Sequence, residues 1–465
     1  MNDNKETLSS KRWLMVLIYL FAGASNALLI LTFSPIIDLA TDYFFVDENM
    51  INLLAVVFQI MFVPGTLLLW SQHKYHDMRG LIFQASLLTC CGCLLRLAAG
   101  GFTNDWFSYS CVLLGTAIVA LAQPFYLTLP AEMASLWFGL GERDMATTVC
   151  GLANPLGSAI GSLLPSMFVT RDGDDDNGKV DGVFNLLLTQ FLVSLFAFIL
   201  VYFSFEAAPA IPPTRSAQKA ANALLNSRKA PSSSSVTSQS DLQPSSWSNI
   251  TELFANKSYV CLFTAFVIGL AHLLAVTALL GQLPGGFSSA QLGGLGAILI
   301  LCGFVGAFMT GLLLDTYKSY QTFLRIVYVL GAVAWIFFLE SFSESNFTLA
   351  GVASGLLGAM LLAMVPITTI SSVEAVYPIS PNVAVGTLYC GANVLAIGFT
   401  FFGSALLKLP SSSLPSLLYP YAIWVFCTSA IGVMAVFLFE SSYKRLQDDQ
   451  SEALLVTSQG AVTEI

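Results

Sequence analysis

Charged residues are scarce in this chain of 465 residues, because Asp, Glu, Lys and Arg together make up 10% of it. Soluble domains carry about 25% charged residues. Apolar residues make up 55% of the chain, and the mean hydropathy is +0.74. A soluble fold of this length could not bury that much apolar surface, so the composition excludes one and indicates that lipid is the solvent.

Arrangements of residues typical of catalysis, metal binding or phosphate binding are also scarce. No nucleophile–base pair, metal cluster or phosphate loop is evident, so we expect neither an enzyme nor a cofactor. The nine cysteines lie in or beside apolar runs and are interpreted as packing residues. The net charge of −9 comes without a basic stripe, which argues against a nucleic-acid partner. The DGDDDNGKVDG run lacks the Glu of a calcium loop and is interpreted as a solvated turn.

Long apolar runs are what the chain does have. Twelve of them, for example Trp13 to Ile37 and Ala290 to Leu314, are long enough for the roughly 20 residues that a membrane span needs. A polar segment divides them six and six, which is typical of a two-lobed transporter. The sequence therefore predicts an all-α membrane protein with twelve transmembrane helices in two six-helix bundles. The expected parts are a cytosolic tail (1–12), a first bundle (13–206), a disordered cytosolic linker (207–256), a second bundle (257–440) and a cytosolic tail (441–465).

Basic residues predict the orientation. With the amino terminus in the cytosol, only Arg171, Lys179 and Lys408 of the 19 Lys and Arg residues fall outside, together with Arg96 at the outer end of the third run. This distribution follows the positive-inside rule, so both termini are expected in the cytosol. We expect Arg96 to extend its side chain to the outer interface.

The two halves place polar residues at matching depths. The spacing from Lys11 to Asn26 equals that from Lys257 to His272, and the fifth and eleventh runs carry Asn154 and Asn393. If the halves are repeats, these four side chains near the midplane could surround a central cavity and bind substrate. The alternative is hydrogen bonding between helices, which is common for Asn and His in membrane bundles. An ionisable group at this depth is costly without a purpose, which favours a functional role for His272.

The predicted turn between the eighth and ninth runs reads Gly311-Leu-Leu-Leu-Asp315-Thr-Tyr-Lys318. Asp315 and Lys318 could pair with helix ends of the other bundle and hold one conformation closed. The corresponding stretch of the first half, from Trp70 to Tyr75, has no Asp, so the equivalent pairing is expected to be degenerate there. Glu374 is expected at a cytosolic turn beside this gate.

These residues carry a family resemblance. The 311–318 turn resembles the G-x-x-x-D-x-x-[KR] signature of the major facilitator superfamily. More specifically, the chain is similar to solute carrier family 49, the feline leukaemia virus subgroup C receptor-related transporters. The segments that carry the likeness are Arg12-Trp13, Ser25 to Ala27, Leu129-Pro130 to Gly139, Asn154 to Pro165, Gly311 to Tyr328, and Glu374 to Gly386.

The resemblance implies small organic substrates such as choline, ethanolamine, haem or pyridoxine-like vitamins. Choline-type members resemble one another in a Trp, a Tyr and two Gln residues, and those places here hold Ile30, Leu274, Pro155 and Asn393. An aromatic cage binds quaternary ammonium by cation–π attraction, so its absence counts against choline. Gln123 and Tyr126 join the expected substrate site, because in this superfamily the fourth span commonly borders the cavity.

The sequence thus predicts a monomeric transporter of a small organic solute that works by alternating access. We expect it in the plasma membrane or an endolysosomal or vacuolar membrane. Proton coupling would use His272, Glu132 or Glu374, whereas facilitated diffusion needs none of them. The alternative function is a receptor or scaffold that kept the fold and lost transport.

Overall fold

The structure is a computed structural model that describes residues 11–73, 75–100, 105–139, 141–171, 180–209, 246–287, 289–317, 319–409 and 419–440. Within these ranges nearly all regular structure is helical. The exceptions are strands β1 (Thr170–Arg171) and β2 (Val180–Asp181), which pair antiparallel. The prediction of an all-α membrane protein is confirmed.

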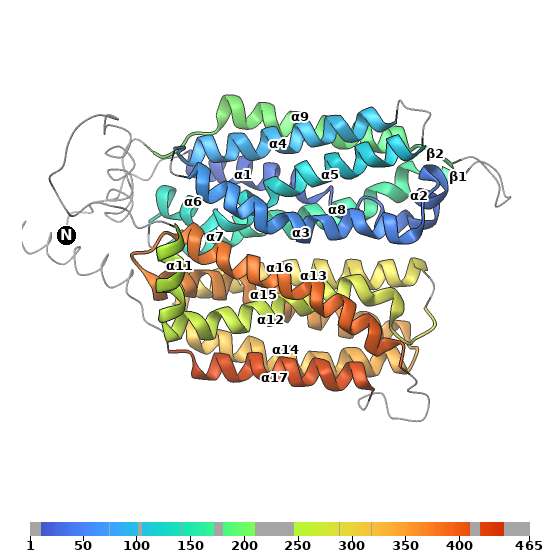
Figure 1. Cartoon of the computed structure of the whole chain (residues 1–465). Coiled ribbons are helices and arrows are strands. Elements are labelled where there is room, and N and C mark those ends of the chain that lie inside the picture. Colours follow the sequence, from blue (N-terminus) through green and yellow to red (C-terminus); the bar gives the residue numbers. More distant parts are fainter. Residues whose placement is uncertain are drawn as a thin grey trace, which may run out of the picture.

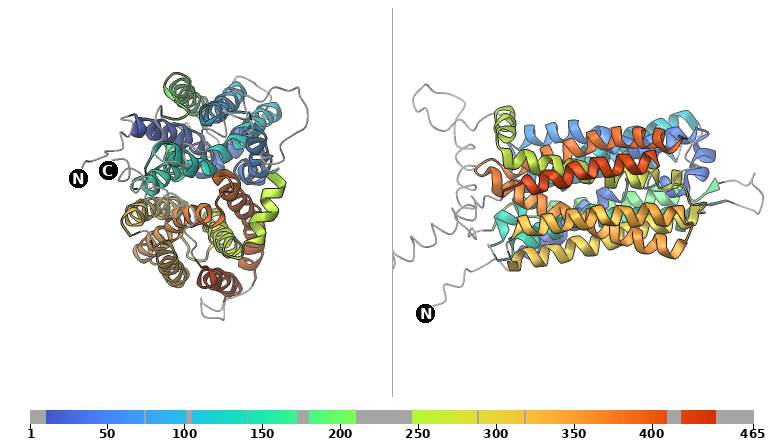
Figure 2. Two further views of the ribbon diagram at one scale, coloured as in Figure 1. Left: turned by 90° about the vertical axis from the view of Figure 1, so that its left-hand side faces the viewer. Right: turned by 90° about the horizontal axis from the view of Figure 1, so that it is seen from below.

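The helices form two bundles that lie side by side (Figure 1). The N-terminal bundle consists of α1 (Arg12–Ala27), η1 (Ser34–Ile36), α2 (Ile37–Phe44), α3 (Glu48–Gln72), α4 (Met78–Ala99), α5 (Asp105–Thr128), α6 (Pro130–Trp137), α7 (Arg143–Gly151), α8 (Ala153–Phe168) and α9 (Val183–Ser204). The C-terminal bundle consists of α12 (Lys257–Leu279), η2 (Leu280–Gln282), α13 (Ser289–Tyr317), α14 (Tyr320–Ser343), α15 (Phe347–Val376), α16 (Pro381–Leu407) and α17 (Pro420–Leu438). The view along the helices shows the two groups stacked one above the other (Figure 2).

Ten of the described helices are long and apolar enough to cross a membrane. The first and fifth predicted crossings are each broken into two pieces. Helix α1 has 16 residues and is followed by a turn, η1 and α2, while α7 and α8 meet at Leu152. Sixteen residues rise about 24 Å, short of the roughly 30 Å hydrocarbon core, so each broken crossing needs both pieces. Counting them gives twelve crossings, six in each bundle, as the sequence predicts.

Glycines let several of these helices approach closely. Gly157 of α8 lies directly against a backbone carbonyl group of α1, and Gly161 lies against that of Leu28, just after α1. Gly303 and Gly306 of α13 lie against α15 in the same way. A Cβ atom at any of these four positions would collide with the neighbouring backbone. Gly151 differs, because a Cβ atom there would meet nothing within 4 Å. Small residues commonly make such close helix packing possible within a membrane.

The end of the predicted linker is ordered, which corrects the expectation of a disordered segment over 207–256. Residues Ser246–Ala255 form α11, which lies across the end of the C-terminal bundle (Figures 1 and 2). Leu253 is fully buried, and the Phe254 ring contacts the Tyr259 ring at 6.1 Å between centroids. The polar composition of the whole linker concealed this short apolar stretch. Residues 210–245 lie outside the described part of the chain.

Arg96 does not extend to the outer interface, and that prediction was wrong. Its side chain is 1% exposed inside the N-terminal bundle. The guanidinium donates to the Thr32 hydroxyl at 3.0 Å and to the Leu29 carbonyl at 3.5 Å, and it lies 5.6 Å from the Phe33 ring centre. These partners belong to the turn after α1, so the broken first crossing provides acceptors that an intact helix would not expose.

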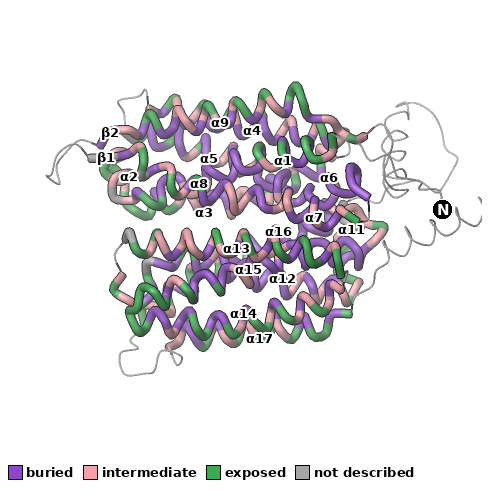
Figure 3. Tube along the Cα trace, turned by 180° about the vertical axis from the view of Figure 1, so that it is seen from behind, coloured by how far each residue is buried: buried purple, intermediate pink, exposed green. Residues whose placement is uncertain are grey.

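One end of the molecule holds the start of α1 and the end of α17, and we call it the terminal end (Figure 1). The short helices α6 and α7 lie at this end and are mostly buried (Figure 3). Both belong to the N-terminal bundle, and α7 packs against α13 and α6 against α16 of the other bundle, so the bundles are joined there.

Candidate functional site

At the terminal end, Asp315 joins the two bundles. It lies in the last turn of α13, and its carboxylate accepts hydrogen bonds from the first turn of α7 in the other bundle. The Asp144 and Met145 backbone N–H groups donate to Oδ1 and Oδ2, at 3.2 and 2.8 Å. A carboxylate at this position satisfies unpaired N–H groups and interacts favourably with the positive end of the helix dipole. The geometry is that of a helix cap supplied by the opposite bundle.

A buried ion pair reinforces this junction. The Arg143 guanidinium donates to the Glu374 carboxylate at 3.2 Å, and the two side chains are 8% and 5% exposed. The Tyr320 hydroxyl, at the start of α14, donates to the Asp144 carboxylate at 2.7 Å. Removing one member of a buried pair leaves an uncompensated charge, so the loss of either side chain alone destabilises the closed arrangement.

A second polar cluster joins the bundles on the other side of the terminal end. His73 Nε2, just after α3, lies 2.9 Å from a Glu132 carboxylate oxygen of α6. Asn382, in the first turn of α16 in the C-terminal bundle, donates to the same carboxylate at 3.2 Å. Burial lowers the pKa of His73, but the charge and hydrogen bond of Glu132 outweigh burial and raise the pKa above its ordinary value. The cluster therefore favours a protonated imidazole between the bundles.

The two clusters occupy related places. Gly311 of α13 lies against Thr148 of the N-terminal bundle, and Gly386 of α16 lies against Thr66 and Trp70 of α3. Asp315 follows Gly311 at the same spacing by which Trp70 follows Thr66. Trp70 thus stands where a second capping carboxylate would be, and Glu132 with His73 provides the polar contact instead. We name the residues Asp315, Arg143, Asp144, Glu374, Tyr320, His73, Glu132 and Asn382 together the terminal latch.

A cavity lies between the bundles next to the latch. It encloses about 920 Å³, counting the space open to solvent. The lining residues come from both bundles: Gln123, Leu127, Pro130, Ala131, Thr147, Thr148, Gly151, Leu152, Asn154, Pro155, Leu270, Leu273, Leu274, Ala307, Leu362, Val365, Pro366, Thr369, Val385, Tyr389 and Asn393.

Three of the six predicted substrate residues line this cavity: Gln123, Asn154 and Asn393. They belong to α5, α8 and α16. Tyr389 and the two threonines of α7 were not predicted. Tyr389 precedes Asn393 by one helical turn, so helical spacing would have been a usable signal for it.

Asn26 and Tyr126 lie inside the N-terminal bundle instead. Asn26 donates to the Thr89 hydroxyl and the Val119 carbonyl, both at 3.0 Å, so it links helices as in the alternative interpretation. Tyr126 is 3% exposed, and its backbone carbonyl accepts from the Tyr19 hydroxyl at 2.9 Å. Neither residue is among those that line the cavity.

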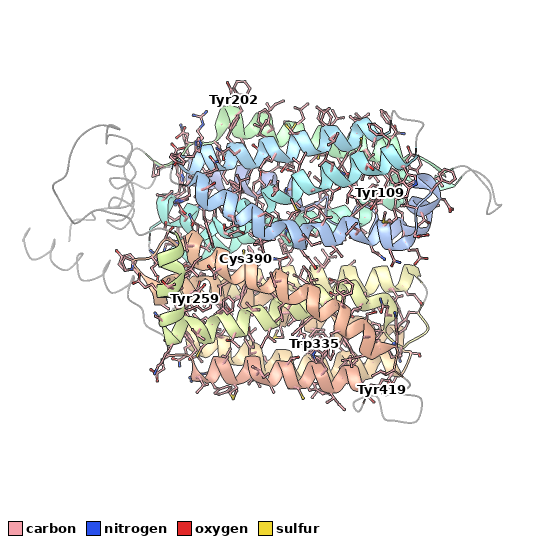
Figure 4. All side chains as sticks on the ribbon, in the orientation of Figure 1. Tyr109, Tyr202, Tyr259, Trp335, Cys390 and Tyr419 are labelled. Atoms are coloured by element: carbon pink, nitrogen blue, oxygen red, sulfur yellow. The ribbon has the colours of Figure 1, made fainter. Side chains whose placement is uncertain are left out.

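His272 points into the C-terminal bundle. Its Nε2 lies 2.9 Å from the Thr428 hydroxyl, and its ring contacts those of Trp335, Phe399 and Trp424. Figure 4 shows Trp335 within this bundle, away from the boundary between the two. His272 lines a separate, smaller cavity there and is not among the residues that line the cavity between the bundles. Of the predicted gate residues, Asp315 and Glu374 lie in the latch, while Lys318 lies outside the described residues.

Comparison with known proteins identifies the family. The family model described as Major Facilitator Superfamily matches residues 15–389. The chain belongs to the Major Facilitator Superfamily. Solved structures of this superfamily share the fold: a proton:xylose symporter aligns with a TM-score of 0.68 over 94% of this chain and 99% of its own, at 12% identity. The fucose:proton symporter of E. coli aligns with a TM-score of 0.64 over 92% and 98%, at 14% identity.

The chain is also similar to curated choline/ethanolamine transporters and to a member of solute carrier family 49. It is 27% identical to the choline/ethanolamine transporter FLVCR1 of Mus terricolor, over 85% of this chain and 70% of the relative. It is 26% identical to FLVCR2 of Rattus norvegicus, over 86% and 70%. It is 25% identical to solute carrier family 49 member A3 of Xenopus tropicalis, over 94% and 88%. The protein is a multi-pass membrane transporter of this superfamily, as the sequence predicts.

Proposed function

We propose that this protein carries a small organic solute through the cavity between its bundles by facilitated diffusion. The observation that supports this proposal best is the position of the cavity. It lies between two six-span bundles, and polar side chains of both reach it. Rocking of one bundle against the other would expose the same groups alternately to the two sides of the membrane.

The latch would act as the gate on one side. Its contacts all join opposite bundles or support residues that do, so they must break before the cavity can open at the terminal end. The positive-inside distribution of Lys and Arg supports a cytosolic position for this end. We therefore propose a monomer in the plasma membrane or an endolysosomal or vacuolar membrane, with the latch on its cytosolic side.

The location of the titratable groups favours facilitated diffusion over proton coupling. His272 lies in the C-terminal bundle, and Glu132 and Glu374 lie in the latch. None of the described residues that line the cavity is Asp, Glu, Lys, Arg or His. A proton carried with the solute would therefore have no acceptor beside it among these residues.

Uptake measurements test the proposal. Cells that express the full chain are given radiolabelled choline, ethanolamine, haem or pyridoxine, the first two because relatives are named for them. We expect at least one compound to accumulate above vector controls, and Asn393→Leu to reduce its uptake at equal surface abundance. Gln84→Leu is the matched control, since Gln84 lies on α4 and bonds Gln72 rather than lining the cavity. No accumulation of any compound would favour the receptor or scaffold alternative.

A further inference from the structure

The polar groups that line the cavity are neutral. Beyond hydrophobic side chains, the described lining consists of three amides, three threonines and one tyrosine. The charged residues at the boundary between the bundles are held in the latch, where each faces another protein group. Arg143 faces Glu374, and Glu132 faces His73. The charges nearest the cavity are thus already used to hold the bundles together.

Two of these amides have an oxygen that accepts no hydrogen bond from the described residues. Gln123 is 8% exposed, and its Oε1 has no hydrogen-bond partner among the described residues. Asn393 uses its Nδ2 to donate to the Tyr389 carbonyl, which leaves its Oδ1 as an acceptor. A buried carbonyl oxygen without a donor is unfavourable, so Gln123 favours a ligand or water that supplies an N–H or O–H group.

A positively charged solute would find little to stabilise it here. A buried cation needs a carboxylate, or several aromatic faces that attract it by cation–π interaction. Tyr389 is the single aromatic residue among the described lining residues, and its ring already packs against Phe62 and Phe266. Leu270, Leu273 and Leu274 form an apolar wall instead. An anion would likewise find no Lys, Arg or His among these residues.

From this lining we infer that the cavity selects an uncharged polar solute, with at least one N–H or O–H donor directed at Gln123 and an apolar part against the leucine wall. This inference rests on the proposed transport function and narrows its substrate class. It separates this protein from a carrier that recognises a solute by its positive charge.

Matched pairs of probes that differ in charge test the inference. 3,3-Dimethylbutan-1-ol has the shape of choline with carbon in place of the charged nitrogen, and nicotinamide is the neutral counterpart of the 1-methylnicotinamide cation. The purified full-length protein is mixed with each probe, and its unfolding temperature is measured. We expect the neutral member of at least one pair to raise this temperature by about 2 °C or more, and its cationic partner to have no effect.

A variant locates the binding. Gln123→Met keeps the length of the side chain and removes the acceptor, so we expect it to weaken the apparent affinity of the neutral probe about tenfold. Gln84→Met is the matched control and should leave that affinity unchanged. A cationic probe that stabilises as well as its neutral partner would overturn the inference, and so would the absence of any shift with both neutral probes.

The outcomes also separate this inference from the proposed function. If choline or ethanolamine accumulates in cells and Asn393→Leu abolishes that uptake, the inference of an uncharged solute is overturned and the transport function stands. If no compound of the uptake panel accumulates, the transport function itself is overturned.

Discussion

Asp315 is the most direct point at which to perturb the gate. Its carboxylate accepts two backbone N–H groups at the start of α7, at 3.2 and 2.8 Å, across the boundary between the bundles. Losing a helix cap costs about 0.5–2 kcal/mol, and hydrogen bonds to charged groups contribute about 1.5–3 kcal/mol. Asp315→Ala should therefore destabilise the closed terminal end by about 2 kcal/mol relative to the open one. That difference shifts the ratio of closed to open molecules about thirtyfold.

Asp315→Asn separates the charge from the shape. It keeps one carbonyl acceptor and loses the negative charge, so we expect a smaller effect of about 1 kcal/mol. In both variants each bundle should fold as it does in the parent protein, because the lost contact joins the bundles and lies within neither. A helical content of each variant equal to that of the parent protein checks this point.

Spin labels measure the population directly. Ser71 at the end of α3 and Thr322 at the start of α14 are exposed, and they belong to opposite bundles. Pulsed electron paramagnetic resonance between labels at these positions, with the native cysteines replaced, gives the fractions of short and long distances. We expect the long-distance fraction to rise in the order parent, Asp315→Asn, Asp315→Ala. An unchanged distribution in Asp315→Ala would refute the assignment of this carboxylate to the gate.

Three further predictions use the same labels. Raising the pH through the pKa of His73, which lies above the ordinary value of about 6.5, should open the terminal end. Protonated His73 stabilises the closed state fully below that ordinary value, and this stabilisation is lost as the pH rises through the raised pKa. His73→Gln should abolish this pH dependence, and a distance distribution of the parent protein that does not change with pH would contradict the prediction. Gly311→Ala should also open this end, since a Cβ atom would lie 2.7 Å from Thr148 and overpacking costs about 1–3 kcal/mol. Gly294→Ala on the same helix is the control and should have no effect, because its Cβ atom would meet nothing within 4 Å. Arg143→Gln should destabilise the closed state by about 3–5 kcal/mol, and adding Glu374→Gln should recover part of that loss; a double variant no better than the single one would exclude the pair as a coupled unit.

Much of the fold follows from the sequence because hydropathy records which segments meet lipid. The count of twelve crossings and the division into two bundles needed no more than that. The breaks at Leu152 and after Ala27 were missed, since both stretches remain apolar across the break. α11 was missed for the opposite reason, because a short apolar stretch follows a long polar one.

The depth of the site residues along their helices could be predicted from the sequence, but the direction in which their side chains point could not. Asn26 and His272 lie at matched positions of the two halves, and both turn into their own bundle rather than toward the cavity. A single sequence gives the height of a residue in its helix, whereas the facing direction depends on how neighbouring helices pack. Contacts between distant segments are also hidden: Arg143 and Glu374 are 231 positions apart, and nothing local to either indicates the other.

The central claim is that the bundles must separate at the terminal end for solute to pass. The native Cys390 of α16 lies at the boundary between the bundles (Figure 4), and its thiol is within hydrogen-bonding reach of Thr66 of α3. Thr66→Cys, with the other native cysteines replaced, would allow a disulfide that locks the bundles together. Uptake of the compound that accumulates best should be lost on oxidation and return on reduction, while either single cysteine alone transports normally. Undiminished uptake by fully cross-linked protein would contradict the account.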